Sequence, residues 1–174
     1  METSGTEVTH PDTGYPTDAV TTLYQDYSLN LIRLAVVMLG DRAAAEDVVQ
    51  EAFYGLYRRW HTLADTAKAL SYVRTSVLNG SRTALRRRSR QTYESPDAPA
   101  QSAEAAVLIG EEHREVLAAI RRLPGRQREV LVLRYYLDLD EAEIARSMGI
   151  SRGTVRSTTS RGLAALGRLL GEDS

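Results

Sequence analysis

The chain has 174 residues, of which 43% are hydrophobic, enough for one or two small domains that each bury a core. It has no cysteine, which excludes disulfides, thiol nucleophiles and cysteine zinc sites, and its three histidines lie far apart in sequence. No apolar run approaches the ~18 residues of a membrane span, and residues 1–19 carry acids but no base, unlike a secretory signal. The composition therefore predicts a cytoplasmic protein that has no metal, no cofactor and no membrane contact.

The formal net charge of −1 conceals a division along the chain. Residues 1–20 carry −4, residues 21–90 carry +5, residues 91–115 carry −5 and residues 116–174 carry +3. Basic blocks suit a polyanionic partner, and acidic segments are often linkers or tails. Arginine, which suits phosphates and base edges, supplies all but one of the 22 basic residues. We attribute that preference to the codon bias of a GC-rich genome.

The first half of the chain is predicted to be a tail followed by a three-helix domain. Residues 1–17 lack periodicity and are expected to be disordered. Over residues 18–90, apolar side chains follow helical spacing in three segments, which can close one small core. Residues 61–67 break the pattern as a loop, and the third helix ends in an arginine-rich run over residues 86–90.

The helix ends of this domain carry recognisable capping residues. Thr17 or Asp18 is expected to cap the start of the first helix, and Gly40 its end. Asp41 is then the expected cap of the second helix.

The second half is predicted to be a linker, a second helical domain and a short tail. Residues 91–107 are acidic and rich in Ser, Pro and Ala, which is linker composition. Residues 108–170 return to helical spacing, with a turn at Pro124-Gly125, and residues 171–174 form a tail. No segment alternates like a strand, so the chain is predicted to be all-α, with two small domains joined by a flexible linker.

The most specific local pattern spans residues 140–156. Asp140 followed by Glu143 fits a capping box, Gly149 stands where a turn needs a positive φ, and Ser151 can cap the next helix. Small or apolar residues at the matching offsets are Ala145, Ile150 and Val155. The pattern predicts a helix-turn-helix, with an ordinary helical hairpin as the alternative. The residues that its second helix would expose to a major groove are Arg152, Thr154, Arg156, Ser157 and Arg161.

A polar stripe runs along the second predicted helix, opposite its apolar stripe. It contains Asp47, Gln50 and Glu51. Judged by physical chemistry alone, these residues form a solvated helix face, and they are too few to hold a metal.

Three stretches resemble sigma factors of the extracytoplasmic function (ECF) type. Residues 45–53 (AEDVVQEAF) resemble the helix that in this family docks on a coiled coil of the RNA polymerase beta-prime subunit. Residues 123–136 resemble the start of the family's second domain, and the helix-turn-helix follows in the family's order. Residues 71–79 resemble most closely the actinobacterial SigE-like branch.

The resemblance implies a non-enzymatic protein that binds core RNA polymerase, through its beta-prime and beta subunits, and promoter DNA, both duplex and melted. The implied polymerase-binding residues are Asp47, Gln50 and Glu51. The loop from His61 to Lys68 and the next helix would recognise and open the −10 element, because cationic grooves grip unpaired strands. On that helix the implied contacts are Arg74, Asn79 and Arg82, with Arg86, Arg87 and Arg88 on nearby phosphates. The implied −35 contacts are Arg152, Thr154, Arg156 and Ser157, with Arg126, Arg128 and Arg161 on phosphates.

Some residues depart from the family's pattern. Thr158 and Thr159 stand where another arginine and an apolar residue are common, which would shift the base contacts. Gly55 and Gly80 interrupt helices, and Gly80 is read either as a bend for DNA approach or as tolerated drift.

Three other classes of function fit the sequence less well than a sigma factor. A free-standing regulator of duplex operators would need a ligand pocket or a dimerisation stripe, and neither is plain in the sequence. An enzyme lacks a phosphate loop, a metal-ligand set or a nucleophile–base pair, and the predicted recognition helix argues against a pure adaptor. No motif in the sequence either indicates or excludes an anti-sigma factor as a further partner.

Overall fold

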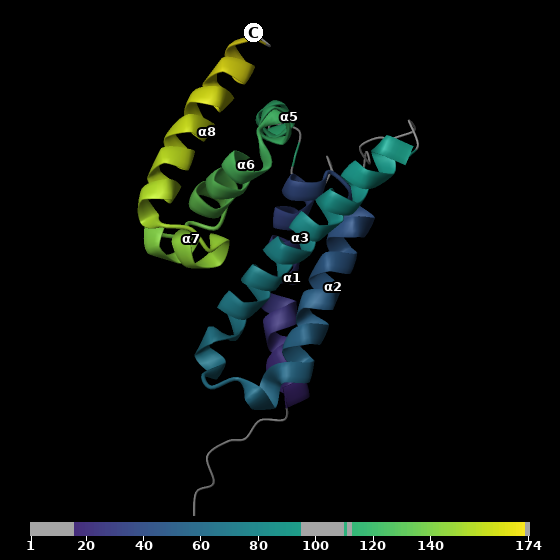
Figure 1. Cartoon of the computed structure of the whole chain (residues 1–174). Coiled ribbons are helices and arrows are strands. Elements are labelled where there is room, and N and C mark those ends of the chain that lie inside the picture. The colour runs from purple at the N-terminus through teal and green to yellow at the C-terminus, as the bar shows by residue number, and fades with distance from the viewer. Residues whose placement is uncertain (1–15, 95–109, 111–112, 173–174) are drawn as a thin grey trace, which may run out of the picture.

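The computed structural model describes residues 16–94, 110 and 113–172, and its described elements are all helical. They are α1 (Pro16–Leu39), α2 (Arg42–Arg59), the 3-10 turns η1 (Trp60–Thr62) and η2 (Thr66–Lys68), α3 (Ala69–Glu94), α5 (Arg114–Arg122), α6 (Gly125–Leu131), the π-turn η4 (Val132–Tyr136), α7 (Glu141–Met148) and α8 (Arg152–Glu172). Helices α1 to α3 form one lobe, and α5 to α8 form a second (Figure 1). The all-α prediction is confirmed, and the described ranges contain no strand.

Two helices are longer than the sequence pattern indicates. Helix α3 continues to Glu94, into the segment predicted as a linker, and α8 continues to Glu172, into the predicted tail. No proline stops α3 before Pro96, so the helix has no reason to end at residue 90. The rest of that linker (95–107) and most of the predicted N-terminal tail lie outside the described residues.

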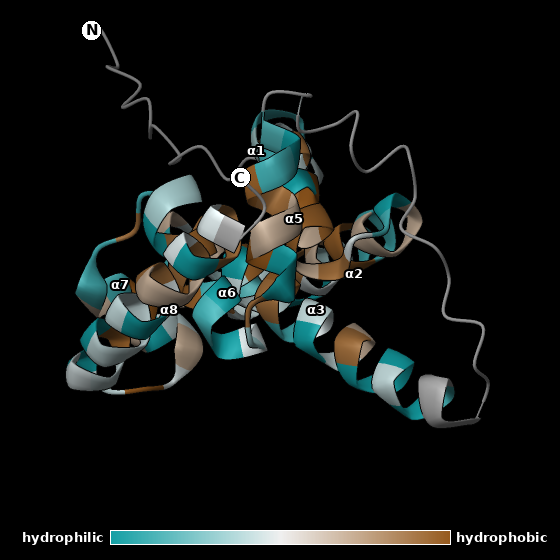
Figure 2. Ribbon diagram, turned by 90° about the horizontal axis from the view of Figure 1, so that it is seen from above, coloured by the Kyte–Doolittle hydropathy of each residue, from teal (hydrophilic) through white to brown (hydrophobic). Residues whose placement is uncertain are grey.

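The first lobe is a three-helix bundle with a continuous apolar interior. Its fully buried side chains come from all three helices and include Leu34, Val49, Leu56, Val73 and Val77. Hydrophobic residues concentrate where the helices face one another (Figure 2). Burying each large aliphatic side chain contributes about 1.5–3 kcal/mol, so this interior fixes how α2 and α3 present their outer faces.

The helix ends follow the predicted capping, with one difference. Gly40 ends α1 with a φ of +71°, and the Asp41 carboxylate accepts a hydrogen bond from the Ala44 amide at 3.1 Å, as predicted. Helix α1, however, begins at Pro16, so Thr17 and Asp18 lie inside its first turn and do not precede it. Proline is favoured at a first helical position because its missing N–H needs no partner there.

The two interrupting glycines of this lobe occupy different environments. A Cβ on Gly80 would lie 2.9 Å from Cγ1 of Val48, so α2 and α3 approach each other closely at this position. Close packing therefore explains Gly80 better than a bend or drift. A Cβ on Gly55 would meet only the Tyr72 hydroxyl, at an ordinary 3.5 Å.

Alanine at these two positions is expected to have opposite effects on the free energy of unfolding. Gly80→Ala should lower it by about 1–3 kcal/mol, because the branched Val48 side chain is stiff and cannot move aside. Gly55→Ala should raise it by roughly 0.5–1 kcal/mol, because alanine is the better helix former. Urea titration followed by circular dichroism measures both, and a stabilising Gly80→Ala would contradict the close approach.

Candidate nucleic-acid and polymerase interfaces

The second lobe contains the predicted helix-turn-helix with its local geometry intact. The Asp140 carboxylate accepts from the Glu143 amide at 2.7 Å, and the Glu143 carboxylate accepts from the Asp140 amide at 2.8 Å, which completes the capping box. Gly149 ends α7 with a φ of +63°, and the Ser151 hydroxyl accepts from the Thr154 amide at 3.1 Å. Each of these three features was predicted from the sequence pattern.

The apolar contacts of the motif decide which side of α8 faces outward. Ile144 of α7 and Val155 of α8 are both buried in the core, and Ile150 packs against it from the turn. Thr158 is also buried, and the Thr159 hydroxyl donates to the Val155 carbonyl at 2.8 Å. Of the two threonines that depart from the family pattern, Thr158 therefore packs in the interior and Thr159 bonds to the backbone of its own helix.

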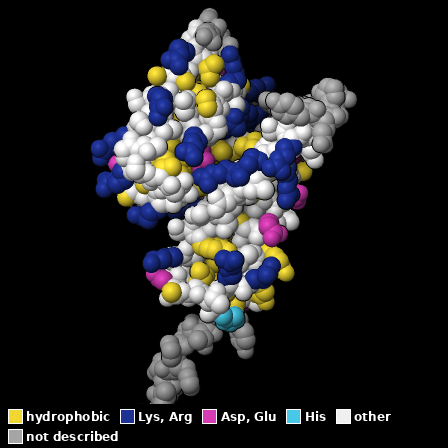
Figure 3. Space-filling view, in the orientation of Figure 1, with side chains coloured by type: hydrophobic (Ala, Val, Ile, Leu, Met, Phe, Trp, Pro, Cys, Tyr) yellow, Lys and Arg dark blue, Asp and Glu magenta, His cyan; other side chains and the backbone are white. Residues whose placement is uncertain are grey.

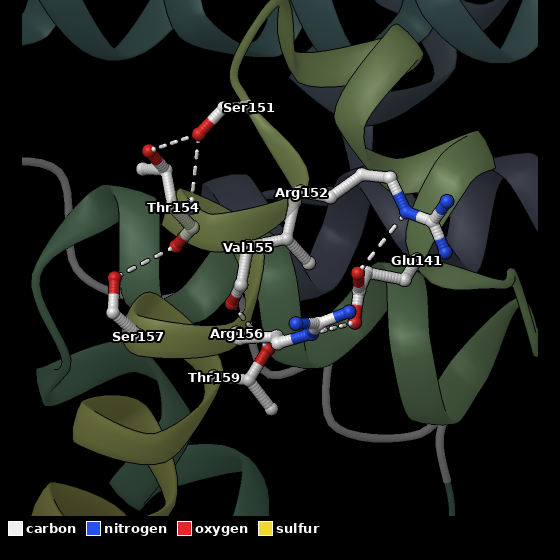
Figure 4. Close-up of polar contacts among 8 residues, drawn as sticks. All are labelled: Glu141, Ser151, Arg152, Thr154, Val155, Arg156, Ser157 and Thr159. Atoms are coloured by element: carbon white, nitrogen blue, oxygen red, sulfur yellow. Dashed lines mark hydrogen bonds and ion pairs between the residues drawn. The ribbon is translucent and has the colours of Figure 1, made fainter.

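The outward side of α8 carries two arginines bound to a single acid of α7 (Figure 4). Arg152 Nε donates to Glu141 Oε1 at 3.2 Å, and Arg156 Nε donates to Glu141 Oε2 at 2.8 Å. The side chains of Arg152 and Arg156 are 64% and 70% exposed, against 21% for Glu141. The hydrogen bond from Arg156 is the main reason that the pKa of Glu141 lies below its usual value.

The other predicted residues lie on the same turns of α8, with Thr154 and Ser157 on the other side of the helix from the two arginine side chains (Figure 4). The Ser157 hydroxyl donates to the Thr154 carbonyl at 3.1 Å, and Arg161 Nε donates to the Ser157 carbonyl at 3.1 Å. Ser157 and Arg161 are exposed, and Thr154 is half-buried. All five residues therefore share the first three turns of α8, as an interface in a major groove requires.

The cap of α7 predicts a pH dependence of stability. The Glu143 amide is the main cause that lowers the pKa of Asp140 below its usual value. Because the folded pKa is the lower one, this cap stabilises the fold above the ordinary carboxyl pKa of about 4, and its contribution is lost as pH falls. Asp140→Asn should keep a neutral cap and remove that part of the pH dependence. The difference in urea midpoint between the two proteins, measured from pH 7 down to pH 3, should therefore change; a constant difference would contradict the assignment.

The predicted polymerase face of α2 is open. Ala45, Val49 and Leu56 lie on its buried side, whereas Asp47 and Glu51 are exposed on the other. Gln50 is exposed on the same face, and no hydrogen bond or ion pair joins these three polar side chains to another described residue. In Figures 1 and 2, α2 lies on the side of the first lobe away from α7 and α8. A partner can therefore reach this face without disturbing the second lobe.

Only some of the predicted −10 residues on α3 are accessible to a ligand. Arg87 and Asn79 are exposed, but Arg82 donates through Nε to Glu129 Oε2 of α6 at 3.0 Å and through Nη2 to Glu129 Oε1. Arg82 Nη1 also donates to the Asn79 amide oxygen at 2.8 Å. The Glu129 side chain is only 3% exposed, so this bidentate pair joins the two lobes in a largely desolvated position.

Two clefts lie between α3 and the second lobe. Arg82 and Arg86 line one of about 490 Å³, together with Arg126. Arg74 lines another of about 570 Å³, together with Lys68 of the predicted −10 loop. Three of the six predicted −10 residues on α3 therefore face the second lobe in this conformation.

Two other arginines bind the carboxyl end of α1. Arg88 donates to the Leu39 carbonyl at 2.6 Å and to the Asp41 carboxylate at 3.0 Å. Arg128 of α6 donates to the Met38 carbonyl at 2.8 Å, which is a second link between the lobes. Cations at this end favour the helix dipole and satisfy carbonyls that have no helical partner. Both residues were predicted to hold phosphates, and in this conformation both have internal partners.

Burial lowers the pKa of Arg128 below its usual value, and the nearby Arg121 adds to the effect. An arginine nevertheless stays charged at neutral pH.

Lys and Arg side chains gather in a band across the middle of the molecule, where α3 passes the second lobe (Figure 3). Such a band attracts a polyanion over several ångströms. Among the described residues there is no group of three or more potential metal ligands. None of the described helices combines the length and the apolar character needed to cross a bilayer.

Two acids that bind these arginines, Glu129 and Glu141, are not indicated by the sequence patterns. Each stands in a basic block and contacts arginines that are distant in sequence. Glu129 directly precedes the apolar run of residues 130–133. A single acid next to positions expected to be buried is a sequence signal for a buried ion pair. No comparable signal singles out Glu141.

Comparison with known proteins agrees with this arrangement. Residues 23–91 match the family described as Sigma-70 region 2, and residues 113–166 match Sigma-70, region 4. The RNA polymerase sigma-E factor of Streptomyces coelicolor is 34% identical over 144 residues, which cover 78% of this chain and 77% of that protein. The chain belongs to the ECF sigma factors. It therefore acts as a subunit that directs RNA polymerase to promoters.

A further relative agrees with this family, and a solved structure agrees with the fold. The ECF sigma factor SigL of Mycobacterium tuberculosis is 29% identical, with 83% of this chain and 84% of that protein covered. The fold matches sigma factor RpoE of Bartonella quintana, solved with the anti-sigma factor NepR, with a TM-score of 0.69. That match covers 88% of this chain and 99% of RpoE at 22% identity, so it supports the fold.

Proposed function

We propose that this ECF sigma factor performs its work through three surfaces on separate helices. Asp47, Gln50 and Glu51 on α2 bind core polymerase. The outward side of α8 binds the −35 element as duplex. The loop before α3, together with the arginines and Asn79 of α3, binds the −10 element as it melts.

The observation that carries the proposal is the opposite placement of two exposed faces. The α2 face is acidic and polar and has no partner among the described residues, which suits a protein surface and repels DNA phosphates. The α8 face follows a complete helix-turn-helix and presents two well-exposed arginines. One chain can therefore hold the polymerase and the promoter at the same time.

The proposal includes a cytoplasmic location and no catalytic activity. Strand opening then draws its free energy from binding, because unstacked bases and exposed phosphates are held in a cationic groove. An anti-sigma factor belongs to the proposal as a further partner, since the Bartonella RpoE was solved in complex with one.

The test is binding to purified bacterial core RNA polymerase by size exclusion, with and without a promoter library. We expect the chain to elute with the core enzyme, and only that complex to enrich a −35 and −10 pair from the library. A chain that ignores the polymerase and shifts duplex DNA alone would instead be a free-standing regulator.

A further inference from the structure

Glu141 lies between the two arginines that the proposed function assigns to the −35 element. Its two carboxylate oxygens accept separately, Oε2 from Arg156 at 2.8 Å and Oε1 from Arg152 at 3.2 Å. Glu141 stands on the first helix of the motif and is itself mostly covered, whereas both arginines are well exposed. The acid is therefore the covered member of the cluster and the arginines are its exposed members.

Glu141 offsets an electrostatic repulsion between the two arginines of the recognition helix. Arg152 and Arg156 are four residues apart, so their side chains share one helix face, where like charges destabilise each other. A carboxylate between them replaces that repulsion with two attractions. It also restricts two long side chains that would otherwise lose rotamer entropy on binding DNA.

The atoms used in the cluster leave the arginines competent for base recognition. Both bonds to Glu141 use Nε, and the described residues offer no other hydrogen bond to either guanidinium. The two terminal nitrogens of each side chain therefore remain available. Such a pair of donors can bind O6 and N7 of guanine, the commonest specific arginine contact in a major groove.

We propose that Glu141 is a positioning residue for promoter selectivity, which holds Arg152 and Arg156 in a shared geometry that reads base edges. The proposal rests on the assignment of α8 to the −35 element. It has a cost, because a carboxylate at the DNA surface repels phosphates of every sequence alike. Glu141 thus lowers general affinity and raises discrimination between sequences.

Glu141→Gln tests the proposal, because it should raise the general affinity for DNA and lower the discrimination between sequences. The variant keeps the size and one acceptor but removes the charge. In the holoenzyme, we expect binding to a duplex with a scrambled −35 element to tighten by roughly twofold to fivefold. We expect the ratio of dissociation constants for scrambled and selected −35 elements to fall by roughly threefold to tenfold. The selected element is the one that the holoenzyme enriches from the promoter library.

Glu115→Gln is the matched control, because it removes the same charge from an exposed position of the second lobe outside this cluster. It should leave the ratio unchanged. An unchanged ratio in Glu141→Gln, or an equal loss of binding to both duplexes, would overturn the positioning role. Failure of the underlying assignment gives a different result: Arg152→Ala and Arg156→Ala would then leave −35 selection intact.

Discussion

Alanine at both Arg152 and Arg156 is expected to abolish promoter-specific transcription and to leave binding to core polymerase unchanged. Each arginine that reads a base pair bidentately contributes about 1–3 kcal/mol of discrimination. Loss of two, about 2–6 kcal/mol, should therefore reduce selective promoter binding by roughly 30-fold to 10⁴-fold. Run-off transcription from the selected promoter, and size exclusion with core enzyme, measure the two activities separately.

The reciprocal variant is Asp47→Arg, which reverses a charge on the open face of α2. It should prevent assembly with core polymerase, since like-charge or mismatched contacts across an interface cost several kcal/mol. It leaves the helix-turn-helix untouched, because α2 lies away from α7 and α8.

Each variant has a matched control. Arg168→Ala removes an exposed arginine from a later turn of α8, and Asp26→Arg reverses an exposed acid on α1. Both controls should behave like the unmodified chain. If the α8 double variant and Asp47→Arg lost the same activity together, the assignment of two separate surfaces would be wrong.

The parts of this structure that sequence could predict are those fixed by near neighbours. A capping box joins residues three apart, and Gly149 and Ser151 act within one turn, so the helix-turn-helix follows from a short stretch. The amphipathic period likewise separates the buried and exposed sides of α2 before any fold is known. Helix ends were harder, because continuation to Glu94 and Glu172 depends on the absence of any stop signal.

The contacts between the lobes could not be predicted, because they join residues far apart in sequence. Arg82 and Glu129 are separated by 47 residues, and Arg128 and the Met38 carbonyl by 90. From composition alone, all of these arginines are expected to bind a polyanion. Only the fold reveals that an internal carboxylate or a helix end already binds three of them, namely Arg82, Arg88 and Arg128.

The pair between Arg82 and Glu129 predicts the second large effect. Removal of one partner from a buried ion pair leaves the other charge uncompensated, which typically costs 3–5 kcal/mol. Because the Arg82 side chain is 27% exposed, we expect Glu129→Ala to lower the free energy of unfolding by about 2–3 kcal/mol. In a double-mutant cycle with Arg82→Ala, the coupling energy between the two side chains should account for most of this loss of stability.

The same pair bears on the contact with −10 DNA that the proposed function assigns to Arg82. A guanidinium held by both oxygens of Glu129 cannot also hold a phosphate or a base, so contact with −10 DNA requires the pair to break. Glu129→Gln should therefore strengthen binding of the full chain to a single-stranded −10 oligonucleotide, and raise the distance between fluorescent labels on α2 and α8. Arg86→Gln, which lines the same cleft without binding Glu129, should not increase either quantity. In the Arg82→Ala background, Glu129→Gln should lose its effect on DNA binding; if the gain persisted there, it would come from removal of a negative charge and not from release of Arg82.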